Sequence, residues 1–142
     1  MSQSWLNEFQ GTEWQGKAEL WLNPDGNDAD ISDCTLRIES DVLSYTWFYE
    51  GETKMGSFTF YEGGTTWVDT WHQTTSVKCV DLADAWGLFT VHYSYGDPSG
   101  AVWGWRSKLS QRPDDSLILQ MTNIAPWGEE GRAVRMVLKK VM

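Results

Sequence analysis

The amino-acid sequence predicts an all-β fold: a closed, antiparallel, up-and-down β-barrel of about ten strands with a short N-terminal helix. Turn-forming residues recur along the chain, for example at 23–27 and 96–100, and Gly, Pro, Asn and Asp favour turns. Between the turns, apolar and polar residues alternate, as expected for strands with one buried face. Short strands spaced about 8–12 residues apart are typical of sandwiches and barrels. At 142 residues, the chain fits one domain, 1–142.

The first expected element is a helix over 4–9, with Trp5 and Phe9 on its apolar side and a glycine soon after its end. We expect this helix to lie outside the barrel. The clearest strand is 14–22, where alternate residues are apolar or small. The other expected strands are 31–39, 41–50, 53–61, 65–73, 76–81, 87–95, 101–109, 116–123 and 132–141.

The edges of the predicted sheet favour a closed barrel. An open sheet of this size leaves a row of unpaired backbone groups at each edge, which invites aggregation, and closure removes both edges. A sandwich of two sheets is the alternative. The short, even connections favour an up-and-down meander over the longer crossings of a Greek key.

Composition and charge limit the partners of the protein. Twenty acidic residues against eleven basic ones give a formal net charge of −9, which repels phosphate backbones and anionic lipid surfaces. We therefore expect no nucleic-acid partner and no membrane association. No apolar run approaches the roughly 18 residues of a membrane helix, and residues 1–8 show no secretory leader pattern, so the expected location is the cytoplasm.

Cysteines and histidines give no sign of a metal or a cofactor. Cys34 and Cys79 lack the paired spacing of zinc and redox motifs. We expect both to be free, small core residues, and a disulfide between neighbouring strands is the alternative. His72 and His92 invite a metal or haem hypothesis, but they follow no known ligand spacing. We expect neither a metal nor a cofactor.

Tryptophan is unusually abundant in this chain. Each of the ten indoles offers about 150–250 Å² of surface to bury, more than a chain of this size needs to fill its interior, so we expect a cavity with aromatic walls. Tyr45 and Trp47 share one face of a strand, and Phe58 and Phe60 lie across the hairpin. The residues expected to line the cavity are Tyr45, Trp47, Trp67, Trp71, Trp103 and Trp105.

The segment 65–73 places a carboxylate among tryptophans. In a strand, Trp67, Asp69 and Trp71 share one face, and His72 lies on the other. If the tryptophan face points inward, burial raises the pKa of Asp69 unless a cation or hydrogen bonds compensate, and such a group marks a functional site. The alternative is a structural Asp69 that pairs with an arginine on a neighbouring strand or caps the rim.

A second tryptophan-rich strand carries both aromatic and basic residues. Trp103 and Trp105 share one face, and Arg106 lies on the other. Arg106 is suited to receive a ligand carboxylate because a guanidinium binds carboxylates through two hydrogen bonds, but a solvated outer face is the favoured alternative. In the loop 123–131, Trp127 either covers the mouth of the barrel as a lid or folds back onto the rim.

Two short motifs carry a family resemblance. Residues 11–16 (Gly-Thr-Glu-Trp-Gln-Gly) open the first strand after a short helix, and residues 67–72 (Trp-Val-Asp-Thr-Trp-His) form a later strand. Both resemble motifs of the calycins, in particular of small bacterial lipocalin-like barrels of uncharacterised function. The resemblance implies a barrel for an apolar ligand rather than a reaction. It also implies that Trp14 closes one end of the barrel against a basic residue of the final strand, Arg135 or, less favoured, Arg132.

The sequence favours a binding protein over an enzyme, because no acid–base pair at a useful spacing is recognisable. The preferred function is the binding of one small, partly apolar or amphipathic molecule within aromatic walls, by a monomer or a homodimer. The alternative is a small lyase or isomerase that uses Asp69 or His72 as general base and Arg106 or a tyrosine to stabilise negative charge. A third hypothesis is a filled barrel that acts through protein contacts.

Overall fold

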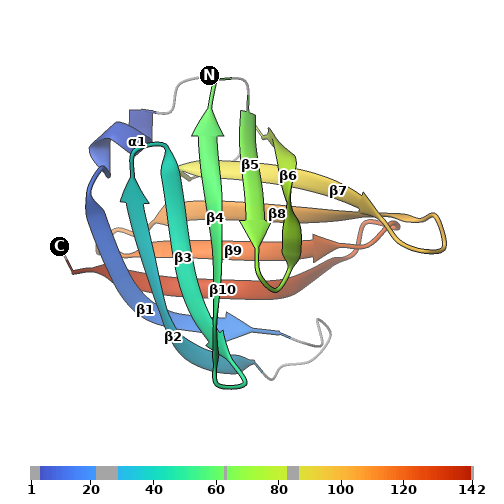
Figure 1. The fold of residues 1–142 in the computed structure, drawn as a ribbon, viewed down its shortest axis with the longest axis horizontal. Coiled ribbons are helices and arrows are strands. Elements are labelled where there is room, and N and C mark those ends of the chain that lie inside the picture. Colours follow the sequence, from blue (N-terminus) through green and yellow to red (C-terminus); the bar gives the residue numbers. More distant parts are fainter. Residues whose placement is uncertain (1–3, 22–28, 63, 83–86, 142) are drawn as a thin grey trace.

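The computed structural model describes residues 4–21, 29–62, 64–82 and 87–141, and it confirms the predicted fold. Ten antiparallel strands close into an up-and-down barrel, in which consecutive strands are neighbours and the last strand pairs with the first (Figure 1). The elements are α1 (Ser4–Glu8), β1 (Thr12–Leu20), β2 (Asp30–Glu39), β3 (Val42–Tyr49), β4 (Glu52–Tyr61), β5 (Gly64–Asp69), β6 (Gln73–Asp81), β7 (Phe89–Gly96), β8 (Val102–Gln111), β9 (Leu117–Ile124) and β10 (Glu130–Lys140).

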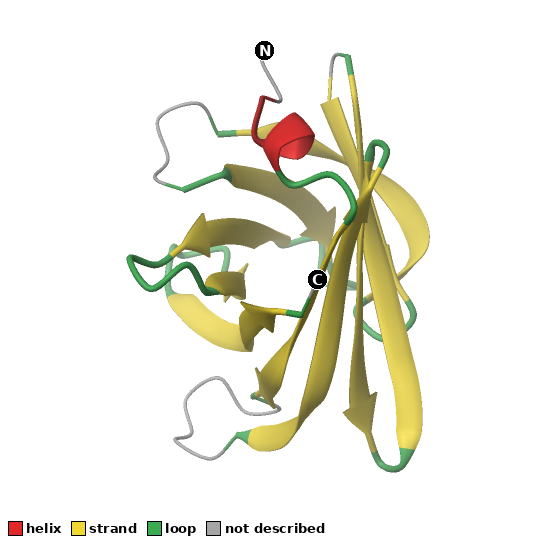
Figure 2. Cartoon of the chain, turned by 90° about the vertical axis from the view of Figure 1, so that its left-hand side faces the viewer, coloured by secondary structure: helices red, strands yellow, loops and turns green. Residues whose placement is uncertain are grey.

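The strands form two layers that cross at a steep angle. Strands β2–β6 run up and down in Figure 1, whereas β7–β10 run across them behind. Strand β1 bends from one layer to the other, so that it pairs with both β2 and β10. The layers are seen from the side in Figure 2, with α1 between them at one end. The inward side chains of the two layers form one continuous hydrophobic core.

The expected strands match the observed ones to within two residues at each end, except around Asp69. The sequence predicts one strand over 65–73 and the next from 76, but β5 ends at Asp69 and β6 begins at Gln73. The side chain of Asp69 accepts hydrogen bonds from the two backbone N–H groups at 71 and 72, and an aspartate that does this turns the chain. The expected turn at 23–27 and the end of the first strand at Leu22 lie outside the described residues.

Helix α1 closes one end of the barrel, which we call the helix end. The ring of Trp5 packs on Phe60 and Phe89, with ring centroids 5.2 and 5.4 Å apart, and Phe9 stacks on Trp14 at 6.0 Å. All five side chains are buried. The expectation that the helix lies outside the barrel is therefore wrong: its apolar side is long enough to fill the space between the layers, and burying that side stabilises the fold.

The barrel wall is weakest between β6 and β7. These strands share two register pairs, Val80 with His92 and Asp81 with Val91, whereas β7 pairs with β8 along the whole of Phe89–Gly96. Beyond His92 the inward side chains of β7 therefore have no hydrogen-bonded neighbour strand on the β6 side. This gap in the pairing lies at the end of the barrel away from α1, which we call the open end (Figure 1).

Both cysteines are free and buried, as predicted. Burial and the nearby carboxylate of Asp33 raise the pKa of the Cys34 thiol to about 12. Burial and Asp81 raise the pKa of Cys79 to about 11. Both thiols are therefore neutral core groups at physiological pH. Among the described helical residues, none forms a helix long and apolar enough to span a membrane.

Candidate functional site

A chain of aromatic rings in contact runs through the barrel from α1 to the open end. Neighbouring centroids along this chain are 4.8 to 6.2 Å apart, within the range of stabilising aromatic pairs. Its members, in order, are Trp5, Phe89, Phe58, Trp67, Trp105, His72, Trp47, Trp71 and Tyr49. At the helix end these rings fill the interior, so the candidate site lies at the open end.

Asp69 is the buried polar centre beside these rings, with 1 % of its surface exposed. Tyr45 Oη donates to its Oδ2 at 2.5 Å, and Trp67 Nε1 in turn donates to Tyr45 Oη at 2.9 Å. The backbone N–H groups of Trp71 and His72 donate to Oδ1 at 2.7 and 2.9 Å. Only a glycine fits opposite Tyr45, because a Cβ at Gly56 would lie 2.3 Å from the phenol oxygen.

The hydrogen bonds decide the charge of Asp69. Burial alone would raise the pKa of its carboxyl, but the contacts with His72 and the hydrogen bond from Tyr45 outweigh burial and hold the pKa below its usual value. Burial and the charge of Asp69 raise the pKa of Tyr45, which stays a proton donor. The buried charge of Asp69 is thus compensated by hydrogen bonds, as one of the two sequence hypotheses requires. The partners are a tyrosine and a histidine, not the arginine of the alternative hypothesis.

His72 points into the barrel, on the same side as Asp69. Its ring lies between Trp47 and Trp105, at centroid distances of 5.6 and 5.0 Å, and 11 % of its side chain is exposed. Nδ1 lies 3.4 Å from Asp69 Oδ1. The prediction that His72 faces away from Asp69 is wrong because the chain turns after Asp69, which ends the alternation of a strand.

Three polar atoms of this group are buried and have no partner within hydrogen-bond geometry among the described residues, although the third of them keeps its 3.4 Å contact with Asp69. They are Trp47 Nε1, Trp105 Nε1 and His72 Nδ1, and the two indoles both pack on the imidazole. An unsatisfied buried donor costs about 1–3 kcal/mol, and such atoms point to a missing ligand or water. The other described atoms of this kind belong to Trp21, Thr90 and Arg135, outside the group.

Two tyrosines of β7 continue the aromatic wall toward the gap beside β6. Tyr93 and Tyr95 stack at 5.9 Å, and they lie opposite Trp105 and Trp103 in the β7–β8 register. Tyr95 Oη donates to Asn123 Oδ1 at 2.8 Å. The sequence analysis missed both tyrosines, although the alternation along β7 places them on the face of the buried Phe89.

Trp71 lies at the rim and not in the interior wall. The indole is 40 % exposed, and it contacts Tyr49 at 4.8 Å with Lys54 Nζ 5.3 Å from its ring centre. The prediction that Trp71 lines the cavity beside Trp67 is wrong, because the turn after Asp69 takes Trp71 out of the strand.

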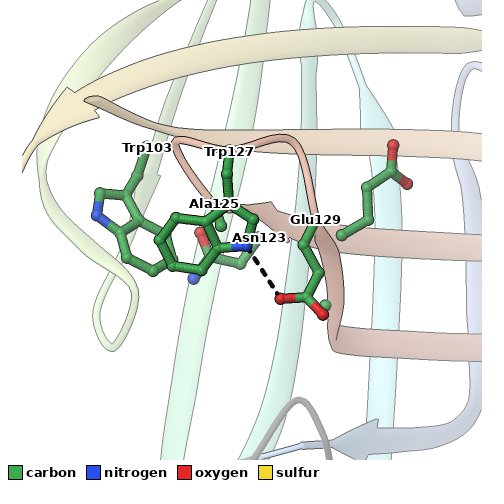
Figure 3. Close-up of a pocket in the computed structure, with 7 residues that line it drawn as sticks. Trp103, Asn123, Ala125, Trp127 and Glu129 are labelled. Carbon is green, nitrogen blue, oxygen red and sulfur yellow. Dashed lines mark hydrogen bonds between the residues drawn. The ribbon is translucent and has the colours of Figure 1, made fainter. Parts of the chain in front are cut away.

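Trp103 also lies at the rim, where it forms a pocket with the loop between β9 and β10. The pocket has a volume of about 240 Å³. Trp103 and Trp127 meet edge to face, with centroids 5.9 Å apart (Figure 3). Trp127 is 72 % exposed, so it forms a wall of the rim rather than a closed lid. We call this the rim pocket; its lining residues are Trp103, Asn123, Ala125, Trp127, Glu129, Glu130 and Gly131.

Arg106 does not face the interior. It alternates with the buried Trp105 and Ser107 and forms two hydrogen bonds with Glu130, at 2.6 and 3.1 Å. The hypothesis that Arg106 receives a ligand carboxylate is therefore wrong, and the favoured outer-face alternative is correct.

Trp14 is buried at the helix end, but Arg135 does not cover it. Its Nε1 donates to Thr12 Oγ1 at 3.0 Å. Arg135 pairs in register with Glu19, five residues along β1 from Trp14, and its guanidinium lies 3.9 Å from the Glu19 carboxylate. The predicted closure by Arg135 is wrong because that side chain alternates with inward Val134 and Met136 and so lies on the outer face. Arg132 instead covers Trp21, at 4.6 Å.

Comparisons with known proteins assign no family to this chain. No family model, no curated protein and no solved structure matches it. Within the described part of the chain, no group of three or more His, Cys, Asp or Glu side chains could hold a metal ion. The function must therefore be argued from the geometry of the open end.

Proposed function

We propose that the protein binds a small, partly apolar molecule at the open end of the barrel, and that the polar end of this ligand is a hydrogen-bond acceptor. The observation that carries the proposal is the pair of buried indole N–H groups of Trp47 and Trp105, which have no acceptor among the described residues and both pack on His72. Native proteins pair nearly all such atoms. A cluster of them on contacting rings favours a bound acceptor over a packing defect.

The chemistry of the group favours a carboxylate. Indole Nε1 is a donor only, so Trp47 and Trp105 both require an acceptor. A carboxylate has two oxygens and accepts several hydrogen bonds, which are stronger when the acceptor is charged. The rings of Trp105 and Tyr93, which lie opposite each other in the β7–β8 register, supply the apolar surface for the rest of the ligand.

The wider features of the molecule support a small organic ligand. The closed ten-strand barrel agrees with a lipocalin-like architecture, and barrels of about eight strands or more hold small ligands. The net charge of −9 opposes nucleic acid as a partner. Two free, buried cysteines fit a reducing compartment such as the cytoplasm.

The test compares the affinities of two carboxylates, phenylacetate and octanoate, with those of two alcohols, 2-phenylethanol and 1-octanol. Tryptophan fluorescence and calorimetry report binding. We expect the carboxylates to bind at least about tenfold more tightly than the alcohols, because hydrogen bonds to a charged group contribute about 1.5–3 kcal/mol. Trp47→Phe and Trp105→Phe keep an aromatic ring and remove the donor, and each should weaken carboxylate binding about tenfold. Trp14→Phe at the helix end is the control and should bind as the wild type does. Equal binding of acids and alcohols, or none, contradicts the proposal.

The contact between Asp69 and His72 favours a second candidate, a lyase or isomerase. With its pKa lowered, Asp69 is a weak base, so it would orient His72 while the imidazole moves the proton. No hydrogen bond within the described chain reaches His72 Nε2. This candidate predicts that the hydrogens on the carbon beside the carboxylate of bound phenylacetate exchange with solvent deuterium, which NMR measures. The His72→Gln variant should lose this exchange. Absence of exchange at saturating ligand rejects it.

A further inference from the structure

We propose that the rim pocket is a second binding site, specific for an organic cation of the alkylated ammonium type. This site does not depend on the acceptor site between Trp47 and Trp105. The cation is expected against the faces of Trp103 and Trp127, which stand at 67° to each other with centroids 5.9 Å apart. Indole faces attract cations more strongly than those of other aromatic side chains, and two rings at a steep angle form two walls of a cage.

Each of these two indoles donates a hydrogen bond to a carboxylate. Trp103 Nε1 donates to Asp97 Oδ2 at 2.8 Å. Trp127 Nε1 donates to Glu129 Oε1 at 3.2 Å (Figure 3). An anion that accepts from an indole N–H increases the electron density of the ring, which strengthens its attraction for a cation. Hydrogen bonds from Ser99 and Trp103 lower the pKa of Asp97, so its charge is present at neutral pH.

The basic side chains near the pocket leave this negative potential unbalanced. Arg106 is engaged by Glu130 in a two-bond ion pair, and neither Asp97 nor Glu129 has an ion pair among the described residues. The pocket therefore presents carboxylate charge beside apolar ring faces, a combination that selects a cation with an alkyl surface over a metal ion or an anion.

Two other indoles of the molecule show what the rim pocket lacks. Lys54 lies over Trp71 at 5.3 Å, and Arg132 lies over Trp21 at 4.6 Å. Among the described residues, no lysine or arginine lies over Trp103 or Trp127, although Trp127 is 72 % exposed. The chain thus covers two indoles with its own cations, whereas Trp103 and Trp127, whose N–H groups donate to carboxylates, have no such cation over them among the described residues. This favours a cation from outside.

The volume of the pocket sets the size of the ligand group. About 240 Å³ accommodates a trimethylammonium head with a short chain but not a whole peptide. The same head occurs on a free molecule such as choline and on a trimethylated lysine side chain of a protein. Both sources share the recognised chemistry, and the experiment separates them.

The experiment titrates the full chain with choline, with its uncharged isostere 3,3-dimethyl-1-butanol, and with a short peptide that contains trimethyllysine or unmodified lysine. Changes in tryptophan fluorescence and in indole N–H NMR signals report binding. We expect choline to bind at least about tenfold more tightly than the isostere. Tighter binding of choline than of the trimethyllysine peptide identifies a free cation as the ligand, and the reverse identifies a modified side chain.

Substitutions in the rim pocket test which residues bind the cation. Trp127→Ala should abolish cation binding, and Glu129→Gln, which keeps the shape of the side chain, should weaken it several-fold. Trp71→Ala, at an exposed indole covered by Lys54, is the matched control and should leave the affinity unchanged. Equal affinity for choline and its isostere, equal loss in Trp71→Ala, or no binding of any cation overturns the proposal.

The two proposed sites can fail separately. Trp127→Ala should leave carboxylate binding unchanged, because among the ring contacts of the described residues Trp127 pairs with Trp103 and not with Trp47 or Trp105. Trp47→Phe should likewise leave choline binding unchanged. A variant at one site that removes both activities contradicts their independence, and a thermal unfolding curve of the same variant shows whether loss of the fold is the reason.

Discussion

The two ends of the barrel use the same residue type in different ways. At the helix end, Trp14 stacks on Phe9 and its N–H group has an acceptor in Thr12. At the open end, Trp47 and Trp105 are 2 % and 9 % exposed, yet neither N–H group has an acceptor. Burial and ring contacts are therefore similar at the two ends. The ends differ in whether the indole N–H groups have hydrogen-bond acceptors.

This difference separates packing from binding in an aromatic-rich interior. A large number of indoles fills much of the barrel and so does not by itself require a ligand, because the rings also stabilise one another. An unpaired donor lowers stability, and a ligand that supplies an acceptor restores the loss. The unpaired donors locate the site more sharply than the count of aromatic residues does.

The largest expected effect is at the helix end. Trp14→Ala should destabilise the fold by about 3–5 kcal/mol, because it leaves a cavity under α1 and removes the contact with Phe9. Urea denaturation followed by circular dichroism measures the change. A midpoint that barely moves would show that α1 does not depend on Trp14, and the helix end would then not be the stable region of the comparison.

Asp69→Asn should cost about 3 kcal/mol at pH 7, since the amide cannot accept all the hydrogen bonds that the carboxylate accepts. The folded-state pKa of Asp69 is below its unfolded value of about 3.9. Its charge therefore stabilises the fold fully above that value, and the contribution is lost as the pH falls through the folded pKa.

The stability difference between wild type and Asp69→Asn should thus be constant above about pH 5 and shrink below about pH 4. Denaturation curves at a series of pH values measure it. A difference that grows toward low pH would mean that Asp69 is protonated in the folded protein, contrary to the network with Tyr45 and His72.

A smaller effect tests the comparison most directly. Trp67 and Trp47 are equally buried, but Trp67 Nε1 donates to Tyr45, whereas Trp47 Nε1 has no acceptor among the described residues. Trp67→Phe should therefore destabilise the ligand-free protein by about 1 kcal/mol more than Trp47→Phe does. Calorimetric unfolding of both variants provides the measurement. Equal losses would remove the distinction between satisfied and unsatisfied indoles.

The smallest effect concerns the two thiols. Their raised pKa values, about 12 and about 11, keep Cys34 and Cys79 protonated and shielded, so native thiol reactivity should stay far below that of a small free thiol from pH 7 to 9. Ellman titration should find two thiols after denaturation without reductant. Finding none, with a monomeric mass, would show a disulfide and overturn the expected reducing compartment.

The fold could be predicted from the sequence because a barrel of sequential hairpins follows local patterns. Period-two alternation locates the strands, and turn residues locate the connections. Most of the site residues could be predicted as aromatic, but their roles depend on the turn after Asp69. A side chain that bonds to the backbone ended the strand there, which moved His72 inward and Trp71 to the rim.

The errors at Trp14 and Arg106 have a different origin. Which strand residues lie opposite each other is set by the register between distant segments, and it pairs Glu19, not Trp14, with Arg135. Alternation along the strand predicts the correct face for Arg106, but its partner Glu130 comes from a strand far along the chain. Pattern within one segment contains no information on such partners.

The pairing of β1 with β10 closes the barrel. Nine of the ten strand pairings in the barrel join neighbours in sequence, and only this one joins residues near the two termini. The entropic cost of closing a long loop is therefore concentrated in a single step. Because that step places the start of β1 beside the end of β10, with Trp14 opposite Lys140, a linker from β10 to α1 could join these two segments, and the barrel could be reopened at a hairpin turn such as Ser40–Asp41 to give a circular permutant with every strand pairing intact.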